Sequence, residues 1–150
     1  MYFAMSVPNI DLADIQTLFE DDPKSMVRGC NGSGLRPSQL AVMMKNPNMA
    51  LFDRLKVYDP GFESRKNNVV GLYNRATPLH LAAHYSNSVV LIKELIQRYP
   101  AALDMEDYDE SSPLIRSLSN NSPEAIDILQ VLLDAAPQAA RKVGYMGQRP

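Results

Sequence analysis

The chain has 150 residues, of which 45% are hydrophobic and 21% are charged, values that are typical of a folded domain and not of a disordered segment. The formal net charge of −2 excludes the chain-wide basic field on which non-specific nucleic-acid binding depends. Cys30 is the single cysteine, so neither an intrachain disulfide nor a cysteine-based zinc cage can form.

Local signals in the first part of the chain predict a capping helix followed by a degenerate two-helix unit. Apolar side chains recur at helical spacing over residues 9–22, which predicts an N-terminal capping helix. The next unit spans residues 34–60, with a short helix that begins at Pro37 and a second helix over 49–58. The Asp-Pro-Gly sequence at 59–61 is a strong signal for the end of that second helix.

The best-defined two-helix unit spans residues 74–100. Thr77 is a favourable N-cap, and Pro78 suits the first helical position because no backbone donor is needed there. These signals predict an inner helix over 78–85. Apolar residues at three- and four-residue steps, with charged residues on the other side, predict an amphipathic outer helix over 89–99.

A further two-helix unit is predicted over residues 109–137. Its inner helix is expected at about 113–119 and its outer helix is expected to be capped by Ser122 and Pro123. Residues 147–150 reproduce the turn that precedes an inner helix, so we expect a further, interrupted repeat to begin there. The buried face of the preceding outer helix is expected to include Ala125, Ile128, Leu129, Leu132 and Leu133.

Two interleaved series of prolines mark these units. The first series is Pro37, Pro78, Pro113 and Pro150, at spacings of 41, 35 and 37 residues. The second series is Pro23, Pro60, Pro100 and Pro137, at spacings of 37, 40 and 37 residues. Periods of 20–50 residues are typical of solenoids, in which each unit packs on its neighbours. The longest connection covers residues 62–76, where we expect an extended finger.

The segment Thr77-Pro78-Leu79-His80-Leu81-Ala82 resembles the T-P-L-H-x-A signature of the ankyrin repeat family. Residues 107–114 are similar to the family's D-x-D-G-x-T-P-L pattern, with Glu110 where glycine is usual. The resemblance implies an all-α, ankyrin-like helical repeat solenoid of helix-turn-helix units joined by loop or β-turn fingers. It also implies that His80 is structural, bonded to neighbouring backbone and to the Thr77 hydroxyl. The motif residues are Thr77, Pro78, Leu79, His80, Ala82, Ser112, Pro113 and Leu114.

Residues that could carry chemistry lack the partners that chemistry requires. A hydrolase built on His80 would need a nucleophile or carboxylate beside it, and none is placed there by the sequence. His80 and His84 have the spacing of a helical metal pair, but the glutamate of a His-Glu-x-x-His enzyme is missing. A calcium loop that starts at Asp107 would have serine and leucine where glycine and glutamate are needed. We therefore expect residues 104–110 to form a solvated finger tip, and we expect no catalytic site, metal or cofactor.

The resemblance implies a protein–protein interaction module, a scaffold or adaptor that binds a partner protein through its finger tips and the concave face of its inner helices. Exposed tyrosine and arginine side chains are typical contact anchors. We expect partner contacts from Tyr73, Arg75, His84, Tyr85, Asp107, Tyr108, Glu110 and Tyr145.

An alternative is that the chain is the regulatory or targeting arm of a longer enzyme or channel that continues beyond residue 150. No apolar run reaches the roughly 20 residues that span a bilayer, and we expect an intracellular, cytoplasmic protein, with the nucleus left open. Neither a nucleic acid nor a membrane is expected as a partner. We expect a monomer, with association left open through an uncapped C-terminal end that exposes Ile128, Leu132 and Leu133.

Overall fold

A computed structural model describes residues 21, 37–43, 49–64, 66 and 75–141. Within these ranges the regular structure is helical and contains no strand. The α-helices are α3 (Pro37–Val42), α4 (Met49–Tyr58), α5 (Pro78–Tyr85), α6 (Val89–Arg98), α7 (Pro113–Ser117) and α8 (Ala125–Ala135). Short 3-10 helices are η2 (Phe62–Ser64), η3 (Pro100–Asp104) and η4 (Pro137–Arg141). Apart from residue 21, the predicted helix at 9–22 lies outside the described residues, as do the turn at 147–150, Tyr73 and Tyr145.

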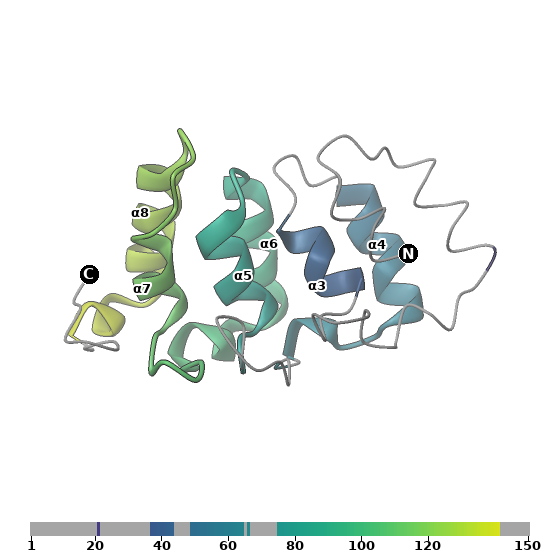
Figure 1. Ribbon diagram of the computed structural model, residues 1–150, viewed down its shortest axis with the longest axis horizontal. Coiled ribbons are helices and arrows are strands. Elements are labelled where there is room, and N and C mark those ends of the chain that lie inside the picture. Colours follow the sequence, from purple (N-terminus) through teal and green to yellow (C-terminus); the bar gives the residue numbers. More distant parts are fainter. Residues whose placement is uncertain (1–20, 22–36, 44–48, 65, 67–74, 142–150) are drawn as a thin grey trace.

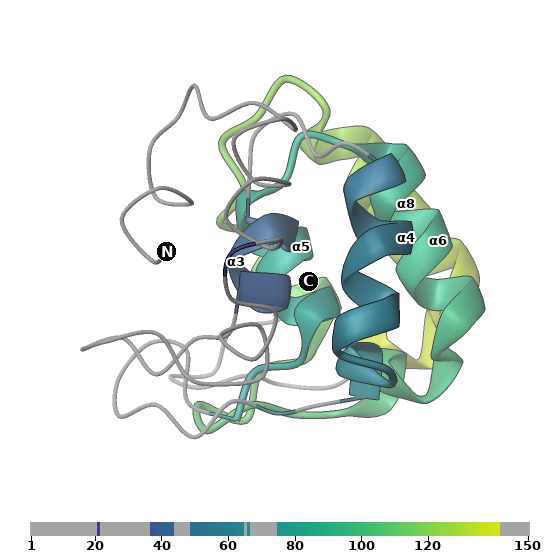
Figure 2. The ribbon, with the colours of Figure 1, turned by 90° about the vertical axis from the view of Figure 1, so that its right-hand side faces the viewer.

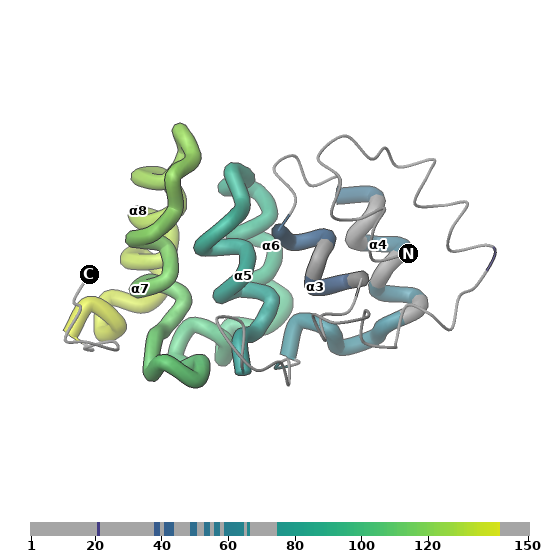
Figure 3. The backbone as a smooth tube through the Cα atoms, in the orientation of Figure 1, coloured from purple at the N-terminus to yellow at the C-terminus, as the bar shows by residue number. Residues whose placement is uncertain are grey.

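The helices form two layers, and within each layer they follow one another along the longest axis of the molecule. Figure 1 shows α3, α5 and α7 side by side in chain order, with α4, α6 and α8 behind them. After a 90° turn, α4, α6 and α8 overlie one another on the right-hand side of Figure 2. α5 packs against α3, α6 and α7, and α8 packs against α6 and α7. The tube in Figure 3 shows α5 followed by α6 behind it, and α7 followed by α8 behind it, so the chain alternates between the two layers.

Helix α5 begins where the sequence predicts. Thr77 precedes it in an extended conformation and forms a capping box with His80, and Pro78 occupies the first turn. Ala82 and Ala83 are completely buried, and their small side chains let α7 pack closely on α5. The predicted inner helix over 78–85 is therefore confirmed.

Helix α6 is amphipathic and ends one residue earlier than predicted. The Ser88 hydroxyl accepts a hydrogen bond from the Leu91 amide at 3.2 Å, which caps the helix. Leu91, Ile92 and Leu95 are buried in the core, whereas Val90 is 64% exposed. Burial of this apolar face against neighbouring helices stabilises α6 more than its helix propensity does.

Two 3-10 helices that the sequence patterns did not predict follow the outer helices. η3 begins at Pro100 and η4 at Pro137, directly after the outer helices α6 and α8 have ended. Each contributes one fully packed small residue to the core, Ala102 and Ala139, both 1% exposed. The second proline series therefore marks the start of a compact turn as well as the end of a helix.

Helix α7 is shorter than the predicted 113–119. The Ser112 hydroxyl accepts from the Ile115 amide at 3.4 Å and caps the first turn. The Ser117 hydroxyl donates to the Leu114 carbonyl oxygen at 2.6 Å, which competes with the backbone ladder in the last turn. Leu118, which follows the helix, is 44% exposed.

The predicted cap of the outer helix α8 by Ser122 and Pro123 is wrong. The helix begins at Ala125, and Glu124 stands at its N-cap position without a capping hydrogen bond from its side chain. The Ser122 carbonyl oxygen instead accepts from the Ala125 amide at 3.1 Å, which forms a turn ahead of the helix. The serine and proline therefore belong to the loop between α7 and α8.

The apolar residues expected on an uncovered face of α8 are largely inside the protein. Ile128 and Leu132 are both 0% exposed, and Leu133 is half-buried. Contacts with α6, α7 and η4 account for this burial. The expectation that Ile128 and Leu132 would be exposed is therefore wrong, and the large hydrophobic side chain that α8 does expose is Ile126.

The α3–α4 pair is held partly by polar contacts. Ser38, which stands where the repeat signature has a leucine, is fully buried and donates to the Asp59 carboxylate at 2.8 Å. After α4, Gly61 adopts a φ of +76°, and Phe62 enters the core at 1% exposure. The predicted helix over 49–58 and its termination by the Asp-Pro-Gly turn are confirmed.

Arg98 connects α6 to the preceding helix pair. Its guanidinium lies 3.0 Å from the Asp53 carboxylate on α4, 3.6 Å from that of Glu63 on η2 and 2.6 Å from that of Glu94 on its own helix. Although burial by itself lowers the pKa of Arg98, the hydrogen bonds to Glu94 and Asp53 raise it above its usual value. The arginine is therefore a permanently charged link between the two pairs.

Candidate functional site

The His80 imidazole links the start of α5 to the loop before α7. The Thr77 amide donates to Nδ1 at 3.2 Å, so Nδ1 carries no proton and accepts from the Thr77 hydroxyl 2.8 Å away. Nε2 lies 3.0 Å from the Ser111 carbonyl oxygen, which can only accept, so the proton is on Nε2. Burial lowers the pKa of His80 to about 4, although the Asp107 carboxylate opposes this. The ring is neutral and structural, as the resemblance implied.

Asp107 organises the loop between η3 and α7 from the inside. It is 4% exposed, and its Oδ1 accepts from the amides of Asp109 and Ser111 at 3.0 and 3.1 Å. Its Oδ2 accepts from Arg116 Nε at 2.5 Å, and the same guanidinium donates to Asp109 at 2.6 Å. Burial opposes the charge on Arg116, but its hydrogen bonds to Asp107 and Asp109 raise its pKa. The expected solvated finger tip is therefore wrong for Asp107.

The outer side of the same loop presents an exposed aromatic residue. Tyr108 is 66% exposed, and Glu110 is exposed with a φ of +55°. The preceding loop shows the same geometry at Arg75, which is exposed with a φ of +60°. Lys66 donates to the Glu106 carbonyl oxygen at 3.0 Å and so ties the two loop regions together.

The structure divides the predicted contact residues between two ends of the helix pairs. Arg75 lies just before α5, and Tyr108 and Glu110 lie just before α7, which packs beside α5. His84 and Tyr85 lie at the opposite end of α5, a helix of eight residues and therefore about 12 Å long. In Figure 2 the connection between η3 and α7 runs along the bottom of the molecule, from the outer layer toward the inner one.

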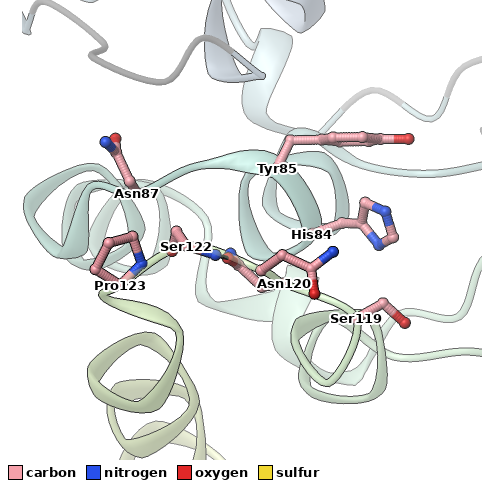
Figure 4. Close-up of a pocket in the computed structure, with 8 residues that line it drawn as sticks. His84, Tyr85, Asn87, Ser119, Asn120, Ser122 and Pro123 are labelled. Atoms are coloured by element: carbon pink, nitrogen blue, oxygen red, sulfur yellow. Dashed lines mark hydrogen bonds between the residues drawn. The ribbon is translucent and has the colours of Figure 1, made fainter.

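A polar pocket lies at the end of α5 that carries His84. It has a volume of about 330 Å³ and is formed by His84, Tyr85 and Asn87 from one helix pair and by residues 119–123 from the next. Figure 4 shows His84 and Tyr85 at the end of α5 and the side chains of the loop after α7 facing them, with Asn120 drawn between His84 and Ser122. The lining combines amides, hydroxyls and aromatic rings and contains no acidic or basic residue other than histidine.

Asn120 holds the two walls of the pocket together. Its side-chain amide donates to the carbonyl oxygens of Ala83 and Ser86, both at 2.8 Å. Its side-chain oxygen accepts from the Ser122 amide at 2.8 Å. Because all three bonds are made to backbone groups, two of them at the end of α5 and one in the loop after α7, the pocket is pre-organised.

His84 is half-buried at the rim of this pocket. Burial lowers the pKa of its imidazole, and the nearby positive charge of Arg116 lowers it further, against a hydrogen bond to the Arg116 backbone. The ring packs edge-on against Tyr85, with 4.2 Å between the ring centroids. His84 Nδ1 is buried and makes no hydrogen bond.

Comparison with known families supports the predicted resemblance. The family model of the ankyrin repeat matches residues 74–108, which contain α5, α6, η3 and Tyr108. The chain carries an ankyrin repeat. No curated protein matches the sequence.

His80 and its hydrogen bonds belong to the start of the matched ankyrin repeat. The segment at 77–82 that resembles the T-P-L-H-x-A signature begins the inner helix of the matched repeat, and Thr77 and His80 form the capping box. The division of the remaining chain into further repeats, at 34–60, 109–137 and 147–150, stays a prediction. Ankyrin repeats are in general protein-interaction modules and are typically non-catalytic.

Sequence reasoning missed the residues that build the polar pocket. Asn120 and Ser122 lie in the loop Ser-Asn-Asn-Ser-Pro, and Ser86 and Asn87 lie in the matching loop of the ankyrin repeat. The signal was an excess of asparagine and serine between helices, but the same excess is ordinary in solvated turns. Only the packing of α5 on α7 shows that the two loops face each other.

The part of the chain that the structure describes contains neither a candidate metal site nor a membrane-spanning helix. Over 37–43, 49–64, 66 and 75–141, no group of three or more His, Cys, Asp or Glu side chains is placed to hold a metal ion. Across those same residues, no helix has both the length and the apolar character needed to cross a membrane.

Proposed function

We propose that the chain is a scaffold or adaptor that binds a partner protein through the loop ends at the N-terminal side of α5 and α7. The surface consists of Arg75, Tyr108 and Glu110 and is here called the loop surface. Support comes from the ankyrin repeat itself, whose helix pairs pack on one another and leave their loops available for recognition.

The observation that carries this proposal is the pairing of an exposed tyrosine with a rigid loop. Tyr108 is 66% exposed, whereas the adjacent Asp107 is buried and fixes the loop backbone through Asp109, Ser111 and Arg116. A large side chain presented in this way loses little conformational entropy when it is covered by a partner. Tyrosine and arginine are also the residue types enriched at binding hot spots.

The remaining predicted contact residues take different places in this proposal. His84 and Tyr85 form a second contact region at the other end of α5, beside the polar pocket. Asp107 supports the loop surface from below, since its carboxylate is occupied within the protein. Tyr73 and Tyr145 lie outside the described residues, and their contacts stay a prediction.

Affinity capture with matched variants tests the proposal. The intact chain is immobilised, and the bound proteins are compared with those bound by Tyr108→Ala and by Ile126→Ala. Ile126 is 79% exposed on α8 and controls for the loss of an exposed hydrophobic side chain elsewhere. We expect a specific partner to be retained by Ile126→Ala and lost with Tyr108→Ala. If both variants captured the partner equally well, the loop surface would not be part of the binding site.

A further inference from the structure

The outer layer of α4, α6 and α8 exposes one large aliphatic side chain on each of its helices. Val57 on α4, Val90 on α6 and Ile126 on α8 are each exposed over more than half of their surface. Among the described residues, the other large hydrophobic side chains that are exposed are Tyr108 and Leu118, which lie outside these helices. Figure 2 shows the three outer helices together on one side of the molecule. This layer therefore offers apolar contact along its whole length.

The exposed charges of the outer layer are sorted by sign along the long axis. They are Arg54 and Lys56 on α4, Lys93 on α6, and Asp127 and Asp134 on α8. Helix α8 contains no lysine or arginine, and the next cation along the chain, Arg141, lies beyond it in η4. Figure 1 shows α4 and α8 on opposite sides of α6. The outer layer is therefore basic at its α4 end and acidic at its α8 end.

These exposed charges are not neutralised within the described part of the molecule. The three cations and Asp127 take part in no salt bridge there. Asp134 accepts a hydrogen bond from the neutral Gln130 amide at 2.7 Å and so keeps its charge. The other exposed charged residue of α4, Asp53, is already bound by Arg98. The two ends of the layer can therefore each attract a surface of opposite sign.

The three outer helices run in the same direction. The residues just before α6 and those just before α8 line the same pocket, so both helices begin at that end of the molecule. Arg98, at the end of α6, contacts Asp53 on α4 and Glu63 just beyond it, so α4 and α6 also end on the same side. A two-fold axis parallel to α6 therefore places α4 of one copy against α8 of a second copy, and the same contact forms again on the other side of the axis.

We propose that the outer layer is the interface of a homodimer in which α4 of each copy faces α8 of the other. Opposite charges then meet at both contacts, whereas an arrangement with α4 on α4 and α8 on α8 would bring like charges together. The dimer departs from the monomer expected from the sequence, and it uses the outer layer and not the C-terminal end.

The size of the outer layer indicates a weak, reversible dimer. Helices of ten residues are about 15 Å long and pack roughly 10 Å apart, so three of them present a face of about 15 by 30 Å. This is smaller than the roughly 800 Å² that each partner contributes to a standard interface. Charge complementarity should therefore decide whether the two copies associate.

The test is the self-association of the full chain, measured by sedimentation velocity together with two charge-reversed variants. One variant is Arg54→Glu with Lys56→Glu, and the other is Asp127→Lys with Asp134→Lys. We expect the unaltered chain to dimerise, with a dissociation constant that rises about fivefold or more when NaCl increases from about 0.05 to 0.5 M, because salt screens the charges. Each variant alone should stay monomeric at the same concentration, because like charges then meet at both contacts.

An equimolar mixture of the two variants makes the test specific. Opposite charges are restored at both contacts of the mixed dimer, which should form with a dissociation constant within about threefold of that of the unaltered chain. A matched control is Glu106→Lys with Glu110→Lys, which changes the net charge as much as the α8 variant does, in the loop before α7. This control should leave dimerisation of the unaltered chain within about twofold.

Three results would overturn the homodimer. They are an unaltered chain that is monomeric at about 1 mM, a mixture that stays monomeric while both variants keep their helical circular dichroism, and assemblies larger than a dimer, which would mean head-to-tail contacts. If a reversed variant loses its helical signal, the neutral pairs Arg54→Gln with Lys56→Gln and Asp127→Asn with Asp134→Asn replace it. Each neutral pair should weaken the dimer about threefold or more, and an unchanged dissociation constant would overturn the interface.

The homodimer and the proposed function use different surfaces. The loop surface lies before the inner helices α5 and α7, whereas the dimer interface lies on the outer helices. Capture of a partner that depends on Tyr108 should therefore be the same for the unaltered chain and for the charge-reversed variants. Failure of either proposal leaves the other open to its own test.

Discussion

Arg75 and Glu110 adopt the same left-handed backbone conformation at matching places, three residues before Pro78 and Pro113, with φ of 60° and 55°. Glycine is the residue that enters this conformation without strain, and the sequence pattern already placed Glu110 where glycine is usual. Both loops therefore keep the same turn although neither has the residue that suits it best.

Replacing Glu110 with glycine should stabilise the protein. Relief of the left-handed strain outweighs the greater freedom of glycine in the unfolded chain, and we expect the free energy of unfolding to rise by about 1 kcal/mol in urea denaturation. Glu106→Gly is the control, because Glu106 is an exposed residue of the same loop without a positive φ. A loss of stability in both variants would contradict the strain at Glu110.

Acid should weaken the fold through His80. The unfolded chain takes up a proton on this residue below pH 6.5, whereas burial keeps the folded ring neutral until about pH 4. Stability should therefore fall as the pH drops from 6.5 toward 4, by about 2 kcal/mol between pH 7 and pH 5. Denaturation midpoints across this range measure the effect. His80→Gln should flatten the profile between pH 7 and pH 5, and an unchanged slope in that variant would assign the acid sensitivity elsewhere.

Leu95→Ala should destabilise the protein by about 2 to 5 kcal/mol, because Leu95 is 3% exposed in the core and its truncation leaves a cavity. Chemical denaturation measures the change. Val90→Ala on the same helix is the matched control, since Val90 is 64% exposed and should cost less than about 0.5 kcal/mol. Similar losses at the two positions would contradict the orientation of α6.

Asp107→Asn should cost about 2 kcal/mol of unfolding free energy, because it leaves the half-buried Arg116 with a weaker partner. The amide can still accept from the Ser111 and Asp109 amides, so the loop should keep its fold. Asp109→Asn, at the more exposed partner of the same guanidinium, should cost less. Thermal unfolding of the two variants side by side provides the comparison, and a larger loss for Asp109→Asn would reverse their assigned roles.

Asn120→Ala should cost about 2 kcal/mol, because two backbone carbonyl oxygens and one amide lose their partner in a largely buried place. Asn121→Ala, at an exposed neighbour, should cost less than about 0.5 kcal/mol. Urea denaturation distinguishes the two. If the two losses are equal, the link between the loops contributes little to stability.

Signals that act within one turn of the chain predicted the helices well. Thr77 and Pro78 placed the start of α5, and the turn after Tyr58 placed the end of α4, because capping and helix termination depend on adjacent residues. The same kind of signal failed at Ser122 and Pro123, where the backbone forms a separate turn before α8 begins. A local motif cannot show whether its hydroxyl faces a helix or a neighbouring loop.

The features that depend on packing could not be predicted from the sequence. Asp107 looked like one of several solvated acidic residues, and its burial follows from Arg116 on α7, nine residues away. The pocket requires the loop after α5 to meet the loop after α7, which joins Asn120 to backbone groups 37 and 34 residues earlier in the chain. Tyr108, Glu110 and Arg75 are exposed, and their contacts with a partner stay a prediction. Nothing local indicated that they are separated from His84 and Tyr85 by the length of α5.

The Asn120 link also places unequal demands on the residues that it joins. The side chain at position 120 must supply two donors and one acceptor, whereas Ala83, Ser86 and Ser122 contribute only main-chain atoms to it. Substitutions at 86 and 122 therefore leave these bonds available, and a substitution at 120 removes all three together. In a library randomised at these positions and selected for folding, asparagine should be retained at 120 while its partners vary, so that the connection between the two helix pairs is inherited through a single codon.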